Sequence, residues 1–66
     1  MATGKVKIIH NNKITGVVVD AQHGNERVFV DQSFPGKGID AGDNVSYDVI
    51  TVPITGEIAI NLNLLQ

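Results

Sequence analysis

Short runs of aliphatic residues alternate with polar residues along most of this chain of 66 residues. The clearest example is residues 58–64, where every second residue is Ile or Leu. A repeat of two is typical of a strand with one face buried, because successive side chains of a strand point to opposite sides. No window carries the apolar stripe of a helix. The pattern therefore predicts an all-β protein.

Five strands are predicted, and the segments between them are rich in turn-forming residues. The strands are residues 5–10, 14–20, 27–31, 45–49 and 58–64. Asn11-Asn12, residues 22–25 and residues 53–56 favour tight turns. Residues 32–44, with Pro35-Gly36 and Gly42-Asp43, form the longest irregular connection. Five short strands in one domain over residues 1–66 indicate a small barrel or sandwich.

The alternation also assigns side chains to faces of the sheet. In the third strand Val28 and Val30 share one face, while Phe29 and Asp31 share the other. We therefore expect Phe29 to point away from the core. Tyr47 alternates with polar residues in the fourth strand and is expected to lie inside.

The net charge makes nucleic acid a less favoured partner but does not exclude it. The net charge is -2 and the pI is about 5.4, which argues against a broad electropositive field. Lys5, Lys7 and Lys13 nevertheless fall close together in the sequence and could form a local basic patch. With no cysteine, the chain has neither disulfides nor thiolate metal ligands.

Several segments fall in the order and spacing of the bacterial cold-shock proteins. They are Gly4-Lys5-Val6-Lys7, Lys13-x-x-Gly16, Val28-Phe29-Val30 and Ala59-x-Asn61-Leu62. Over nearly its whole length the chain resembles a divergent cold-shock domain. The resemblance implies a five-stranded antiparallel OB-fold barrel that binds single-stranded RNA or DNA through its first three strands. Separately, we expect a cytoplasmic location, because no stretch is long and apolar enough to span a bilayer and no apolar signal core follows the first lysines.

The chain departs from that family where the family stacks bases. Ile8-Ile9 stands in place of Trp-Phe, Ile14-Thr15-Gly16-Val17 in place of Gly-Phe-Gly-Phe, and Asp31-Gln32 in place of His-Phe. Phe29 remains at a matching position, and Phe34 is an extra aromatic in the following loop. Because stacking contributes roughly 1 to 3 kcal/mol per base, losing several rings should weaken binding by decades.

Two hypotheses follow. In the first, the chain binds single-stranded nucleic acid weakly and without strong sequence preference, with Asp31 placing a negative charge near the phosphate path. The candidate site residues are Lys5, Lys7, Ile8, His10, Lys13, Thr15, Val17, Phe29, Asp31 and Phe34.

In the second hypothesis, nucleic-acid binding is lost and an aliphatic face contacts a protein partner or forms a homodimer. That face would contain Ile8 or Ile9, Val17 and Phe29. A different strand register or a bulge would instead place these side chains in the core.

The sequence gives no pattern for catalysis or metal binding. His10 and His23 are the only histidines, and they lack the ligand spacing of a zinc site. No nucleophile motif or phosphate-binding loop is present. We therefore expect no enzymatic activity, no cofactor and no metal. The sequence also has no apolar run long enough to span a bilayer.

Overall fold

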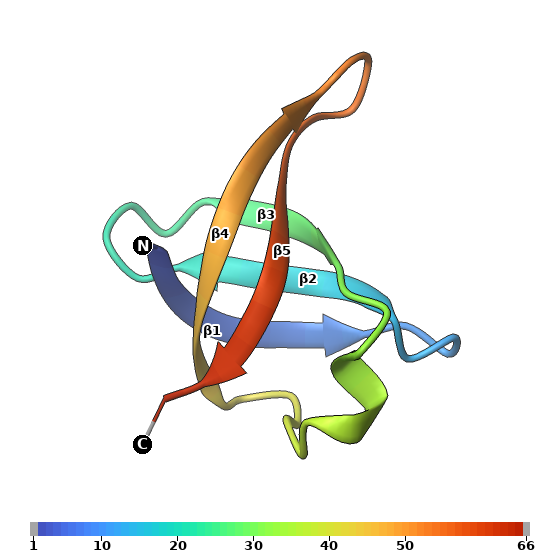
Figure 1. The fold of residues 1–66 in the computed structure, drawn as a ribbon. Helices are drawn as coiled ribbons and strands as arrows, with labels where there is room; N and C mark the ends of the chain where they lie inside the picture. The colour runs from blue at the N-terminus through green and yellow to red at the C-terminus, as the bar shows by residue number, and fades with distance from the viewer. Residues whose placement is uncertain (1, 66) are drawn as a thin grey trace.

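The computed structural model describes residues 2–65, which form five strands and one short 3-10 helix (Figure 1). The elements are β1 (Ala2–Ile9), β2 (Thr15–Asp20), β3 (Glu26–Val30), η1 (Phe34–Gly36), β4 (Asn44–Val52) and β5 (Gly56–Leu64). The strands close into a barrel in the order β1-β2-β3-β5-β4. The predicted all-β class and five-stranded OB-like barrel are confirmed.

The pairing is mixed, so the expectation of a purely antiparallel barrel was wrong in one place. Four neighbouring pairs are antiparallel, whereas β3 and β5 run parallel and meet at the single pair Phe29 and Ala59. The reason is topological. A closed ring with an odd number of strands cannot alternate direction at every step, and β3–β5 is where the two like directions meet. We call this junction the β3–β5 seam.

A bulge in β1 decides which isoleucine is exposed. Val6 pairs with Val18 and Ile8 with Val17, so β1 has one more residue than β2 in this interval. The extra residue shifts the alternation by one position. Lys7 and Ile8 are consequently both exposed, while Ile9 packs against the core.

A second irregularity interrupts the alternation in β5. Between the pairs Ser46–Asn63 and Asp48–Ile60, β5 has one more residue than β4, and Asn61 adopts a φ of 55°. A bulge with a left-handed residue changes which side of the strand faces inward. Ala59 and Leu62 are therefore both buried, although an uninterrupted strand would point them to opposite faces.

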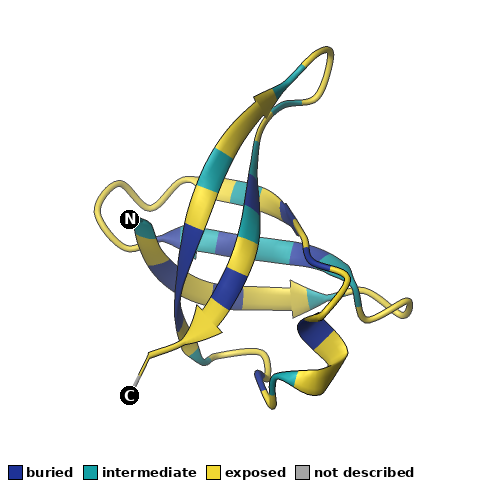
Figure 2. Cartoon of the chain, viewed as in Figure 1, coloured by how far each residue is buried: buried dark blue, intermediate teal, exposed yellow. Residues whose placement is uncertain are grey.

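The core contains all Phe and Tyr rings of the chain. Figure 2 shows in dark blue where buried residues lie along the strands and η1. Tyr47 is buried, as predicted. Phe29 and Phe34 are buried as well, with ring centroids 4.8 Å apart. The expectations that Phe29 points outward and that Phe34 is available in the loop were wrong. The buried hydrophobic residues are Val6, Val18, Phe29, Phe34, Ile39, Val45, Tyr47, Ala59 and Leu62.

The β4–β5 hairpin extends beyond the barrel and ends at the turn of residues 53–55 (Figure 1). Its two strands cross in front of β1, β2 and β3 in this view, so the outer surface of those three strands faces the opposite side. In the part of the chain that the structure describes, no helix is long and apolar enough to cross a bilayer.

Candidate interaction surface

A row of exposed and half-buried aliphatic side chains crosses the outer surface of β1, β2 and β3. Ile8 is the pairing partner of Val17, and Val17 is the partner of Val28 on the next strand. Val30 extends the row along β3, opposite Thr15. Ile8, Val28 and Val30 are 46%, 42% and 37% exposed. We call Ile8, Val17, Val28 and Val30 the aliphatic face.

Polar pairs border the aliphatic face on two sides. On one side an ion pair joins Lys7 to Glu26, and Lys5 lies on the same cross-strand row as Glu26, with Val19 between them. On the other side His10 Nδ1 lies 2.8 Å from Thr15 Oγ1. An apolar centre with a polar border is typical of a surface that contacts another macromolecule.

Gly16 explains why β3 has the opposite orientation to the one predicted. Gly16 pairs with Phe29, and a Cβ at Gly16 would lie 2.4 Å from the Phe29 ring. The space left by the missing side chain is therefore filled by this ring. With Phe29 inside, alternation turns Val28 and Val30 outward. The sequence analysis missed these two valines, although a glycine opposite an aromatic on the neighbouring strand was a usable signal.

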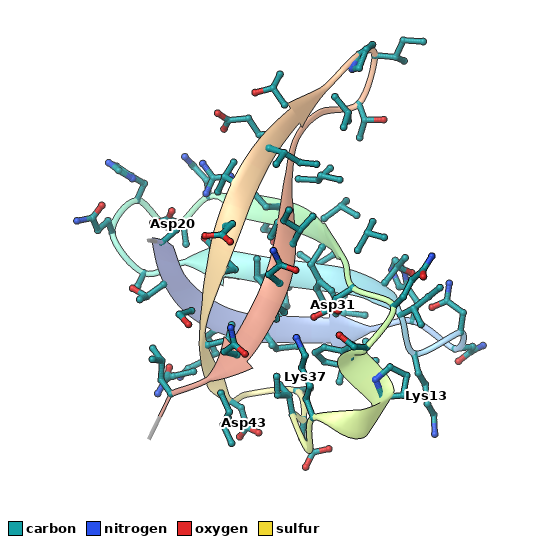
Figure 3. The ribbon with its side chains drawn as sticks, viewed as in Figure 1. Lys13, Asp20, Asp31, Lys37 and Asp43 are labelled. Atoms are coloured by element: carbon teal, nitrogen blue, oxygen red, sulfur yellow. The ribbon has the colours of Figure 1, made fainter. Side chains whose placement is uncertain are left out.

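Asp31 is also inside, so its expected place near a phosphate path was wrong. Its carboxylate lies 2.6 Å from Lys37 Nζ and accepts hydrogen bonds from the amide and hydroxyl of Ser33 and from the amide of Leu62 (Figure 3). Burial acts to raise the pKa of Asp31, but the hydrogen bonds from Lys37 and Ser33 outweigh it and the pKa is lowered. The charge is neutralised within the fold.

A second ion-pair cluster joins four strands. Arg27 donates to Asp20 at 2.9 Å and to Glu57 at 3.1 Å, and its guanidinium lies 3.4 Å from the Tyr47 hydroxyl. Asp20 also accepts from the amides of His23 and Gln22, and these bonds together with Arg27 lower its pKa to about 2. Figure 3 places Asp20 toward the far end of the barrel from Asp31.

Ion pairs within the fold use three of the five lysines and arginines. Lys7, Arg27 and Lys37 each form an ion pair within the fold. In the part of the chain described by the structure, Lys5 and Lys13 are the remaining lysines or arginines without one. Of the ten predicted site residues, the exposed or half-exposed ones are Lys5, Lys7, Ile8, His10, Lys13, Thr15 and Val17.

A cleft of about 220 Å³ lies between the β1–β2 turn and η1. Its more buried lining consists of Ile9, Phe34 and Ile39, and its exposed lining consists of Lys13, Pro35, Gly38 and Asp40. Figure 3 shows Lys13 on the turn beside η1. The cleft is separate from the aliphatic face and has an apolar interior.

Comparison of the sequence with models of protein families gave no match, and a search of curated proteins gave no similar sequence.

Proposed function

We propose that this barrel is a protein-interaction module that pairs with a second copy of itself through the aliphatic face. The observation that supports this proposal is the row across three strands in which exposed Ile8 and Val28 lie on either side of half-buried Val17. Association would remove this apolar surface from contact with water, which is favourable.

The border of the face suits contact with an identical surface. Lys5 and Lys7 on β1 and Glu26 on β3 place both signs of charge along one edge. In a two-fold symmetric dimer, each patch meets a copy of itself, so the cations of one copy can approach the carboxylate of the other. A domain of this size has a small stability margin, which burial of the face would increase.

The test replaces Val28 and Val30 together by threonine. Threonine keeps the β-branched shape and strand preference of valine but adds a hydroxyl to the exposed surface. We expect the wild-type chain to dimerise with rising concentration in sedimentation equilibrium, and V28T/V30T to weaken dimerisation at least tenfold.

Leu64→Thr is the matched control, because Leu64 is similarly exposed but lies on β5, away from the aliphatic face. It should dimerise as the wild type does. A wild-type chain that stays monomeric across the concentration series, or equal dimerisation of V28T/V30T and wild type, would contradict the proposal.

A second candidate function is the weak binding of single-stranded nucleic acid that the cold-shock resemblance implies, with a cytoplasmic setting as part of the same proposal. The observation that favours it is that Lys5 and Lys13 are exposed and have no ion-pair partner among residues 2–65, which the structure describes. The buried positions of Phe29 and Phe34 leave this candidate without stacking. Saturable, salt-sensitive binding of labelled oligo-dT or oligo-U would support it, and no binding at low salt would remove it.

A further inference from the structure

The tip of the β4–β5 hairpin presents an isoleucine in an unfavourable conformation. Ile54 has a φ of 73°, and the amide of Thr55 donates to the carbonyl of Pro53 at 2.8 Å. A hydrogen bond over two residues with a positive φ between them defines the rare, strained form of the γ-turn. A β-branched residue at positive φ is an outlier, since glycine or asparagine accepts this region more readily.

Ile54 is also fully exposed to solvent, so it gains nothing from the core. Backbone strain that no contact within the fold offsets is a reason to look for a function at that residue. An apolar side chain at the end of a projecting hairpin is well placed to enter a hollow on another molecule. The cleft beside η1 is such a hollow.

The size and lining of the cleft suit an isoleucine side chain. An apolar cavity of roughly 150 Å³ holds a benzene-sized group, so a cleft of about 220 Å³ has room for the four carbons of isoleucine. Ile9, Phe34 and Ile39 offer it apolar contacts. Figure 1 shows the hairpin tip and η1 at opposite ends of the molecule, so a chain cannot fill its own cleft.

We infer that Ile54 of one copy docks into the cleft of the next copy, which makes a head-to-tail contact between identical chains. This contact joins two different surfaces, so it does not close on itself after two copies and can continue into longer assemblies. It is independent of the aliphatic face, because neither Ile54 nor the cleft contains a residue of that face. The contact area is small, so the association is weak and reversible.

Charge sets the orientation of the docked hairpin. Glu57 is the charged residue closest to Ile54 in the sequence. One of its carboxylate oxygens pairs with Arg27 of the same chain, and its side chain is 56% exposed. Among the residues that the structure describes, Lys13 on the cleft has no ion-pair partner. Docking that turns Glu57 toward Lys13 and away from Asp40 is favoured. Lys13→Glu should therefore weaken the assembly, and Asp40→Lys should strengthen it.

The test uses the V28T/V30T background, in which association through the aliphatic face is expected to be at least tenfold weaker. Ile54→Asn takes away the apolar side chain while accepting the positive φ, and Ile54→Leu keeps an apolar side chain of the same size. We expect I54N to be at least as thermally stable as its parent but monomeric, and I54L to assemble as the parent does. A purely structural role for Ile54 would not separate stability from assembly in this way.

Gly38→Asn tests the cleft, as Ile54→Asn tests the hairpin tip. Gly38 lines the cleft, has a φ of 70° and has no atom near the position of a Cβ, so asparagine fits there. We expect its side chain to hinder entry to the cleft. Gly24→Asn is the matched control, with a φ of 72° and similar open space in the β2–β3 turn. G38N should be monomeric, whereas G24N should assemble.

Mixing the two monomeric variants provides the decisive measurement. I54N retains its cleft and G38N retains its tip, so together they should form a one-to-one dimer that grows no further in sedimentation velocity. A parent chain that is monomeric up to about 1 mM, where contacts of about 4 kcal/mol become visible, would overturn the inference. Assembly of I54N alone, or a mixture that stays monomeric while the parent assembles, would overturn it as well.

Discussion

Gly16 is the residue on which the inward position of Phe29 depends. A Cβ at Gly16 would lie 2.2 Å from the carbonyl oxygen of Ile8 and 2.4 Å from the Phe29 ring. Because the first of these atoms belongs to the backbone, it cannot move aside as a flexible side chain could. We expect Gly16→Ala to lower the free energy of unfolding by about 3 kcal/mol, at the upper end for overpacking.

Gly36→Ala is the control for this prediction, since nothing lies near the position of a Cβ at Gly36. It should change the free energy of unfolding by less than about 0.5 kcal/mol. Urea unfolding followed by circular dichroism measures both. A G16A variant as stable as G36A would mean that the Phe29 ring does not occupy the space beside Gly16.

Which side chains face the core was the least predictable feature of this structure. The alternation correctly grouped Val28 with Val30 and Phe29 with Asp31, but it could not say which group faces inward. Long-range contacts made that choice, namely Gly16 on β2 and Lys37 after η1. The exposure of Ile8 depends on a bulge at Lys7, which the sequence of β1 alone does not signal.

At the scale of elements, the β3–β5 seam is the junction with the least backbone pairing. Its single bridge, Phe29 with Ala59, lies between two sets of side-chain contacts. At one end Arg27 pairs with Glu57. At the other, Asp31 accepts from the amide of Leu62, and the ammonium of Lys37 donates to the carbonyl of the same residue. These side chains supply the hydrogen bonds that a longer ladder would provide.

Removing Lys37 should therefore open the seam. Lys37→Met leaves the Asp31 carboxylate buried without its cation, which costs up to about 3 to 5 kcal/mol for a fully buried pair. Because Lys37 is partly exposed, we expect a loss of about 2 kcal/mol in thermal unfolding, where solvent screens part of the charge. Lys5→Met should have little effect, because Lys5 is exposed and forms no ion pair with any residue that the structure describes. Equal losses in the two variants would exclude a special role for the Asp31–Lys37 pair.

The strands themselves were predictable, because each has its own apolar repeat and is bounded by turn-forming residues. Their ends were less so. β1 begins at Ala2 instead of residue 5, and β4 continues to Val52 instead of residue 49. At the start of β1, Ala2 pairs with Tyr47 on a strand far away in the sequence, whereas Val52 pairs with Gly56 across the turn of the β4–β5 hairpin. A local pattern does not contain that information.

At the scale of the whole molecule, the five-stranded barrel followed from the strand count and from the cold-shock resemblance, whereas the surface chemistry did not. Burial of every Phe and Tyr ring and the use of three cations in ion pairs are properties of the closed barrel. They change the balance between the two hypotheses. With its Phe and Tyr rings all buried, the surface favours an apolar contact over base stacking.

The two ion-pair clusters also make the stability of the barrel depend on acid. The pKa of Asp20 is lowered from 3.8 to about 2, and the pKa of Asp31 is lowered too. A carboxyl with a lower pKa in the folded state binds protons mainly after unfolding, so its contribution is complete above about pH 4 and is lost as pH falls toward 2. The melting temperature should therefore stay level from pH 7 to about 5 and fall steeply between about 4 and 2. Asp20→Asn should melt lower than wild type at pH 7 but change less over the acid range. Parallel acid curves for D20N and wild type would show that Asp20 does not contribute to this dependence.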